Sequence, residues 1–125
     1  MAAYLAADPR VGWVSFAGFP DHPHHELVQR YLKGRVPSII TFGAAGGYDA
    51  GLAFFDSLQL FKRLLNLGDA KSLAIHPAST THRQLSDDEL VAAGIRPETI
   101  RLSIGLEHID DLIEDIDQAL TAATS

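Results

Sequence analysis

Four short apolar runs, separated by polar or glycine-containing segments, dominate the pattern of the chain and predict four β-strands. These runs are rich in β-branched and aromatic residues, which favour a pleated, partly buried surface. They cover residues 11–16 (VGWVSF), 38–42 (SIITF), 72–75 (SLAI) and 100–104 (IRLSI). Each run is short for a helix, so a strand is the better interpretation.

The segment after the second run carries apolar residues at helical spacing and predicts the longest helix of the chain. This helix is expected over residues 48–65. Phe54, Leu58, Phe61 and Leu65 recur in it at i, i+4, i+7 and i+11, so they share one face. We therefore expect all four side chains to face the core.

Two further helical segments are predicted near the N-terminus. Residues 22–32 are expected to form a helix with Asp21 as its N-cap and Pro23 in its first turn. Residues 1–7 contain good helix formers but start abruptly, so they are interpreted as the end of a longer helix.

The C-terminal part of the chain contains two more predicted helices. Ser86 and Glu89 form the sequence pattern of a capping box, which begins a short helix, and Gly94 suits the position just after it. The last helix is expected over residues 108–122, where five apolar residues share one face: Ile109, Leu112, Ile113, Ile116 and Leu120.

Strands and helices therefore alternate, which predicts an α/β (α+β) fold with a small four-stranded sheet and helices mainly on one face. Side chains alternate across a sheet, so Ile100, Leu102 and Ile104 are expected to face the helices. Arg101 and Ser103 then project from the opposite face. A guanidinium in an apolar strand suits a planar anion, and a carboxylate fits its fork bidentately.

Composition narrows the class of protein. A chain of 125 residues forms one domain with its own core, and no apolar run is long enough for a membrane span. No signal peptide is visible, and the absence of cysteine excludes disulfides and thiolate metal sites, which fits a cytoplasmic protein. The net charge of −6 and the lack of a basic stripe argue against nucleic acid as a partner.

Several candidate sites have simpler interpretations. The three histidines at 22–25 are expected to be solvated side chains, so no metal site is predicted. His76 and His82 flank three hydroxyl residues at 79–81, an arrangement that suggests a hydrolase with a Ser/His pair. The sequence contains no G-x-S-x-G pattern, which argues against this activity. The glycines at 43–47 lack the known phosphate-binding patterns, so they predict a turn.

The chain resembles the C-terminal domain of the cystathionine γ-synthase-type enzymes, which use pyridoxal phosphate (PLP) in cysteine and methionine metabolism. The resemblance rests on NLGDAKSL, HPASTTHRQL and RLSIGLE, and it extends through VGWVSFAGFPDHPHHELVQRYL and TFGAAGGYDAGLAFFDSLQLF. The O-acetylhomoserine sulfhydrylases are the subgroup most similar to it. The resemblance covers essentially all 125 residues in the correct order.

This resemblance implies a fold-type I enzyme in which residues 1–125 are the C-terminal domain, the part that binds the substrate carboxylate. Arg101 in RLSIGL would bind the α-carboxylate, and Asn66, which opens NLGD, would hydrogen-bond the same group. The implied reaction makes homocysteine from an O-acylhomoserine and sulfide in methionine biosynthesis. The complete enzyme would contain PLP and would be a homo-oligomer, expected to be a tetramer.

One essential part of the family is missing from the sequence. The family lysine lies in a Ser-x-Thr-Lys motif, and none of the three lysines, Lys33, Lys62 and Lys71, follows that pattern. The chain is therefore expected to be a fragment without the large PLP-binding domain. We expect no catalytic or cofactor-binding residue in it, no bound PLP and no activity when it is alone.

Other functions remain open at this stage. A methionine γ-lyase or a cystathionine synthase or lyase of the same family would share these motifs. A non-catalytic interaction or oligomerisation module, descended from such a domain, needs no lysine. For any truncated domain we expect an exposed apolar patch, around residues 1–5 and the glycine turn.

Overall fold

The computed structural model describes all 125 residues and contains a five-stranded mixed sheet. Its order is β1-β2-β5-β4-β3, and neighbouring strands are antiparallel except β3 and β4, which are parallel. The bounds are β1 (Val11–Ser15), β2 (Ile39–Ala44), β3 (Lys62–Arg63), β4 (Leu73–Ile75) and β5 (Thr99–Ser103). All four predicted strands are present, and the two-residue β3 is an additional edge strand.

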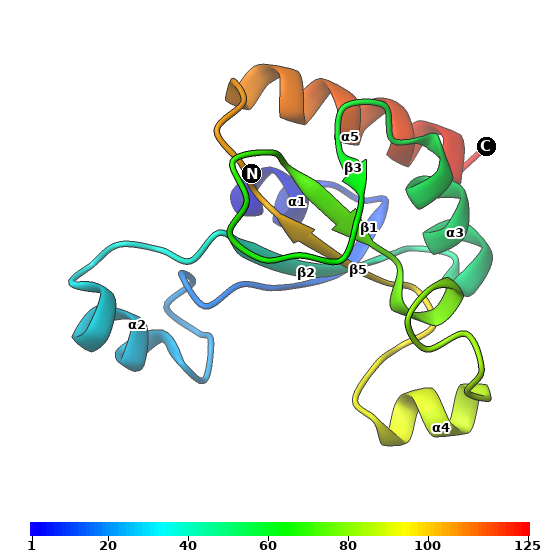
Figure 1. Cartoon of the computed structure of the whole chain (residues 1–125), viewed down its shortest axis with the longest axis horizontal. Coiled ribbons are helices and arrows are strands. Elements are labelled where there is room, and N and C mark those ends of the chain that lie inside the picture. Colours follow the sequence, from blue (N-terminus) through cyan, green and yellow to red (C-terminus); the bar gives the residue numbers. More distant parts are fainter.

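Five helices and one 3₁₀ turn lie before, between and after the strands. They are α1 (Ala2–Ala7), α2 (His25–Leu32), α3 (Gly47–Ser57), η1 (Pro77–Ser79), α4 (Asp87–Ala92) and α5 (Ile109–Ala123). Figure 1 shows α3 and α5 together on one side of the sheet, whereas α2 and α4 stand away from it. None of the helices has the length and apolar character that crossing a membrane requires.

The core lies between one face of the sheet and the helices α1, α3 and α5. Alternate residues of β2 and β5 point into it, because Ile40 pairs with Leu102 and Phe42 with Ile100. Leu5 of α1 joins the same cluster. Apolar residues of α3 and α5 complete it: Phe54, Phe55, Leu112, Ile116, Ala119 and Leu120. The predicted one-sided helical layer is confirmed.

The prediction of a long helix over residues 48–65 is wrong in its second half. Helix α3 ends at Ser57, and Leu58 has an extended backbone conformation. The buried carboxylate of Asp115 in α5 accepts the N–H groups of residues 59–61 at 2.8–3.0 Å. These N–H groups would bond to carbonyls four residues earlier if the helix continued. Leu65 therefore leaves the predicted stripe and is 63% exposed.

The prediction for α2 is wrong at its start. Asp21 is not the N-cap, because the helix begins at His25 after His24, which makes no capping bond through its side chain. Residues 19–25 instead form successive turns, in which the His22 ring accepts the N–H of His24 at 3.1 Å. The capping box of Ser86 and Glu89 is present as predicted at the start of α4.

Candidate functional site

Arg101 projects from the face of β5 that lies opposite the helices. Its neighbours on the adjoining strands are Thr41 and Ile75, and both belong to the same face. The Arg101 side chain is half-buried, and it takes part in no ion pair and no side-chain hydrogen bond. As predicted, this cation is not neutralised inside the chain, so its five donors remain open to an anion.

Asn66 lies in an exposed turn that reaches the same face. Its side-chain oxygen accepts the N–H of Leu67 at 2.9 Å, and its amide group lies 3.5 Å from an oxygen of Asp69. The N–H of Gly68 donates to the hydroxyl of Ser103 at 3.2 Å. Side chains two apart on a strand share a face, so this bond brings the turn to the face that carries Arg101. The structure thus brings the turn that contains Asn66 to the side of the sheet from which Arg101 projects.

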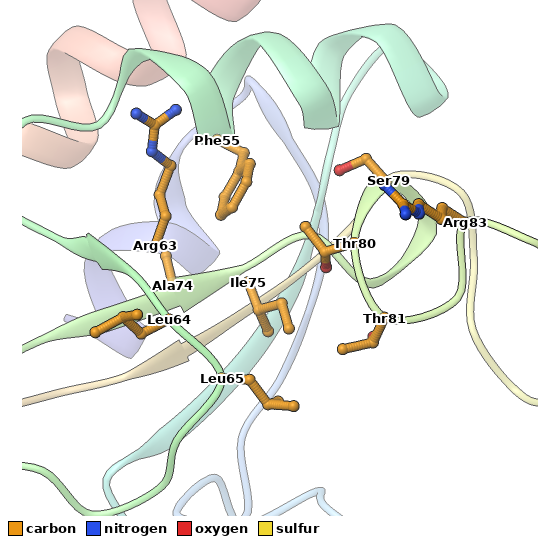
Figure 2. Close-up of a pocket in the computed structure, with 10 residues that line it drawn as sticks. All are labelled: Phe55, Arg63, Leu64, Leu65, Ala74, Ile75, Ser79, Thr80, Thr81 and Arg83. Atoms are coloured by element: carbon orange, nitrogen blue, oxygen red, sulfur yellow. The ribbon is translucent and has the colours of Figure 1, made fainter.

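A pocket of about 360 Å³ opens at the edge of β4 where β3 has ended (Figure 2). Ile75, the neighbour of Arg101 on β4, forms part of its wall, and so does Leu65, which precedes Asn66 in the chain. The remaining lining residues come from α3, β3 and the residue after it, β4, η1 and the loop after η1: Phe55, Arg63, Leu64, Ala74, Ser79, Thr80, Thr81 and Arg83. The pocket therefore combines an apolar floor with hydroxyl and guanidinium groups.

Sequence reasoning missed the hydroxyl residues 79–81 as pocket-lining groups, because it treated them only as possible nucleophiles. A signal was available, since the polar loop directly follows β4, a strand next to the one that carries Arg101. Of the two arginines at the pocket, Arg63 is paired with Asp56 at 3.2 Å and lies over the Phe55 ring. Arg83 is exposed and takes part in no ion pair.

His76 ties this loop to the segment before β5. The ring is completely buried, and its Nε2–H donates to the carbonyl oxygen of Pro97 at 2.7 Å. Nδ1 then carries the lone pair and accepts the hydroxyl of Ser79 at 2.8 Å. Burial lowers the pKa of His76, against the opposing effects of the Pro97 carbonyl and the Asp56 charge, and so favours this neutral form. The structure brings Ser79 and His76 together, and both ring nitrogens of His76 form hydrogen bonds within the chain.

The sequence offered two other candidates, the histidines at 22–25 and the glycine segment at 43–47. No group of three or more metal-ligating side chains comes together anywhere in the chain. His22 contacts Ser15 at 3.3 Å, and His25 contacts the carbonyl oxygen of Ala17. In the glycine segment, Gly46 and Gly47 have positive φ values of 119° and 75°, which makes this segment a tight turn before α3.

The lysines of the chain do not suit a Schiff base with PLP. Such a lysine must lie in an enclosed site where its amine can lose its proton. Lys33, Lys62 and Lys71 are all exposed, and none lines the pocket beside Arg101. The residues present therefore do not form a PLP site by themselves.

Comparison with known proteins places these features in context. Residues 1–121 match the family model described as "Cys/Met metabolism PLP-dependent enzyme". The chain is 49% identical to O-acetyl-L-homoserine sulfhydrylase 1 of Thermus thermophilus and 46% identical to homocysteine synthase of Schizosaccharomyces pombe. The matches cover 96% and 98% of this chain but only 28% and 29% of those proteins.

A solved structure is similar along the same stretch. It is described as an O-acetylhomoserine (thiol)-lyase from Campylobacter jejuni with N′-pyridoxyl-lysine-5′-monophosphate. The TM-score is 0.84 at 44% identity, and the match covers 96% of this chain and 28% of that one. The chain thus spans little more than a quarter of the length of the relatives that it matches.

Proposed function

The chain belongs to the Cys/Met metabolism PLP-dependent enzyme family, and on this basis we propose that it is the C-terminal, substrate-carboxylate-binding domain of an O-acetylhomoserine sulfhydrylase. In the complete enzyme, the acyl-oxy group of an O-acylhomoserine is replaced by sulfide, which yields homocysteine for methionine biosynthesis. The names of the relatives from Thermus thermophilus and Schizosaccharomyces pombe support this reaction among those of the family.

The observation that carries the proposal is the unpaired guanidinium of Arg101 on the face without helices. A half-buried cation without an internal partner is costly unless a ligand or another surface neutralises it. The α-carboxylate of an amino acid matches the guanidinium fork with two parallel hydrogen bonds. The Asn66 amide can donate a further bond to the same carboxylate from the turn beside Ser103.

PLP supplies the electron sink for chemistry at the α- and β-carbons of amino acids. This chain offers no suitable lysine, so we propose that the cofactor is held by the part of the enzyme that residues 1–125 do not span. The role of this domain is to bind the substrate through its carboxylate and thereby orient it. We further propose that its partners are the PLP-bearing domain and other copies of the enzyme, in the cytoplasm.

A titration of the ¹⁵N-labelled chain with O-acetyl-L-homoserine tests the carboxylate site. We expect shifts of the Arg101 Nε–H and Asn66 side-chain amide resonances. Arg101→Ala should weaken binding at least about 100-fold, because a desolvated bidentate pair contributes about 3 kcal/mol. Arg83→Ala is the control, since Arg83 is an exposed arginine without an ion pair that lines the pocket next to Ile75, the β4 neighbour of Arg101. Equal effects of the two substitutions would contradict the proposal.

A further inference from the structure

Residues 103–106, which follow Arg101 in the chain, form hydrogen bonds with the stretch that contains Asn66. Two hydrogen bonds join the stretch from Leu64 to Ala70 to residues 103–106. The N–H of Gly68 donates to the Ser103 hydroxyl at 3.2 Å, and the N–H of Leu106 donates to the Ala70 carbonyl oxygen at 2.9 Å. The Asn66 turn, residues 66–69, therefore depends on residues 103–106 for its place.

A second group of hydrogen bonds joins Gly105 and Glu107 to Ser72. The Glu107 carboxylate accepts the N–H of Ser72 at 2.7 Å with one oxygen and the Ser72 hydroxyl at 2.8 Å with the other. The Ser72 oxygen in turn accepts the N–H of Gly105 at 2.8 Å, and Ser72 is completely buried. Gly105 permits the close approach, because a Cβ there would lie 2.4 Å from the Ala70 carbonyl oxygen.

The charge state of Glu107 suits this role. Burial and the nearby Asp69 charge raise the pKa of its carboxyl group, but hydrogen bonds from the N–H and hydroxyl of Ser72 and from the backbone of Glu107 together lower the pKa below its usual value. The carboxylate is therefore ionised at neutral pH and forms charge-assisted bonds, which are stronger than neutral ones.

Few other contacts hold the Asn66 turn in place. Leu64, Leu65 and Leu67 are 58–63% exposed, so they anchor nothing in the core. The side-chain contacts of Asn66 are local, to Leu67 and Asp69. An exposed turn of this kind loses conformational entropy when it is ordered, and the bonds from residues 103–107 must offset that loss.

We propose that Ser103 and Glu107 are positioning residues that hold the Asn66 turn against the face of β5 that carries Arg101. Residues 101–107 thus provide the Arg101 cation that binds the carboxylate. They also provide the hydrogen bonds that hold Asn66, the second donor to this carboxylate, and we call these bonds the clamp. The functional consequence rests on the function proposed above, whereas the clamp itself is a property of this chain alone.

Amide hydrogen exchange and side-chain NMR of the ¹⁵N-labelled chain test the clamp without any ligand. Ser103→Ala should speed exchange at Gly68, and Glu107→Gln at Ser72, each by about tenfold, the factor that one net hydrogen bond contributes. Both should shift the Asn66 side-chain amide, and Ser103→Thr, which keeps the hydroxyl, should restore protection at Gly68. The controls are Ser57→Ala and Glu114→Gln, because neither side chain takes part in a hydrogen bond.

The outcomes separate the two proposals. Unchanged exchange at Gly68 and Ser72 together with an unchanged Asn66 resonance would overturn the clamp, whatever the chain binds. A titration with O-acetyl-L-homoserine then tests its consequence: Ser103→Ala should weaken binding several-fold, whereas Ser57→Ala should not. If Arg101→Ala leaves the titration unaltered, the carboxylate site fails, while the exchange data still decide the clamp.

Discussion

At the scale of single residues, His76 shows how a buried polar side chain connects separate parts of the site. Its two ring nitrogens join Ser79, in the pocket wall, to Pro97, just before β5. The ring of Tyr48 in α3 lies 5.2 Å away between centroids, and a Cβ at Gly51 would come within 3.0 Å of Nε2. The neutral imidazole is therefore closely packed among Tyr48, Gly51, Ser79 and Pro97.

We predict that His76 makes the stability of the chain pH-dependent. The pKa is lowered in the folded state, so the unfolded chain binds more protons below about pH 6.5. The free energy of unfolding should therefore be highest above that pH and should fall as the pH drops from 6.5 to 5. Urea denaturation across this range should show a weaker dependence for His76→Gln but not for His24→Gln. Equal slopes for both variants would contradict the prediction.

At the scale of elements, the end of α3 is decided by a residue of α5. The two helices pack on the same face of the sheet, where Asp115 meets the chain as it leaves α3. Gln118 adds a bond to the Asp115 carboxylate at 3.1 Å and another to the carbonyl oxygen of Ser57 at 2.6 Å. These contacts direct residues 59–61 into β3 and so determine where the chain starts towards Asn66.

We predict that Asp115→Asn lowers the free energy of unfolding by about 3 kcal/mol, because an amide cannot accept all of these N–H bonds. Amide exchange at residues 59–61 should accelerate together with this loss. Asp111→Asn provides the comparison, since Asp111 is an exposed carboxylate in the first turn of the same helix. A loss below about 1 kcal/mol, the value of one ordinary hydrogen bond, would show that Asp115 does not hold this segment.

At the scale of the whole molecule, an apolar pocket of about 570 Å³ opens beside the N-terminal residues. Nine of its twelve lining residues are hydrophobic, and they include Met1, Phe19, Val36 and Ile109. The sequence predicted an apolar patch around residues 1–5, and this half of the prediction agrees with the pocket. The glycine turn does not contribute, because none of residues 43–47 lines it.

We predict that the isolated chain self-associates through this pocket with rising concentration. Val36→Ser should reduce association in sedimentation experiments, because Val36 is 59% exposed and lines the pocket. Val91→Ser is a matched control, since Val91 is 61% exposed on α4, outside the pocket. A chain that stays monomeric at all concentrations would remove the support for a docking surface here.

A last prediction concerns the cofactor. The purified chain should form no stoichiometric adduct with PLP that borohydride can trap on one lysine, because Lys33, Lys62 and Lys71 are all exposed. Mass spectrometry after reduction provides the measurement, and substoichiometric labelling spread over the three lysines is the expected background. A single, fully modified lysine would contradict the assignment of the PLP site to another part of the enzyme.

The sequence by itself determined the four main strands, the one-sided helical layer and the side of β5 on which Arg101 lies. These features follow from local patterns, because the alternation of Ile100, Arg101 and Leu102 assigns faces whatever the strand neighbours are. The capping box at Ser86 was equally readable, since all of its bonds lie within four residues.

Only the tertiary structure decided where α3 ends and how Asn66 meets the face that carries Arg101. Both depend on bonds between residues far apart in the chain, at sequence separations of 54–56 for Asp115 and its N–H donors and 35 for Gly68 and Ser103. The local spacing of apolar residues favoured a helix that continues to Leu65. It carries no information about the Asp115 carboxylate, which reaches residues 59–61 only when α5 packs beside α3. The same reason explains why the pocket at β4 and the Glu107 clamp were not predicted.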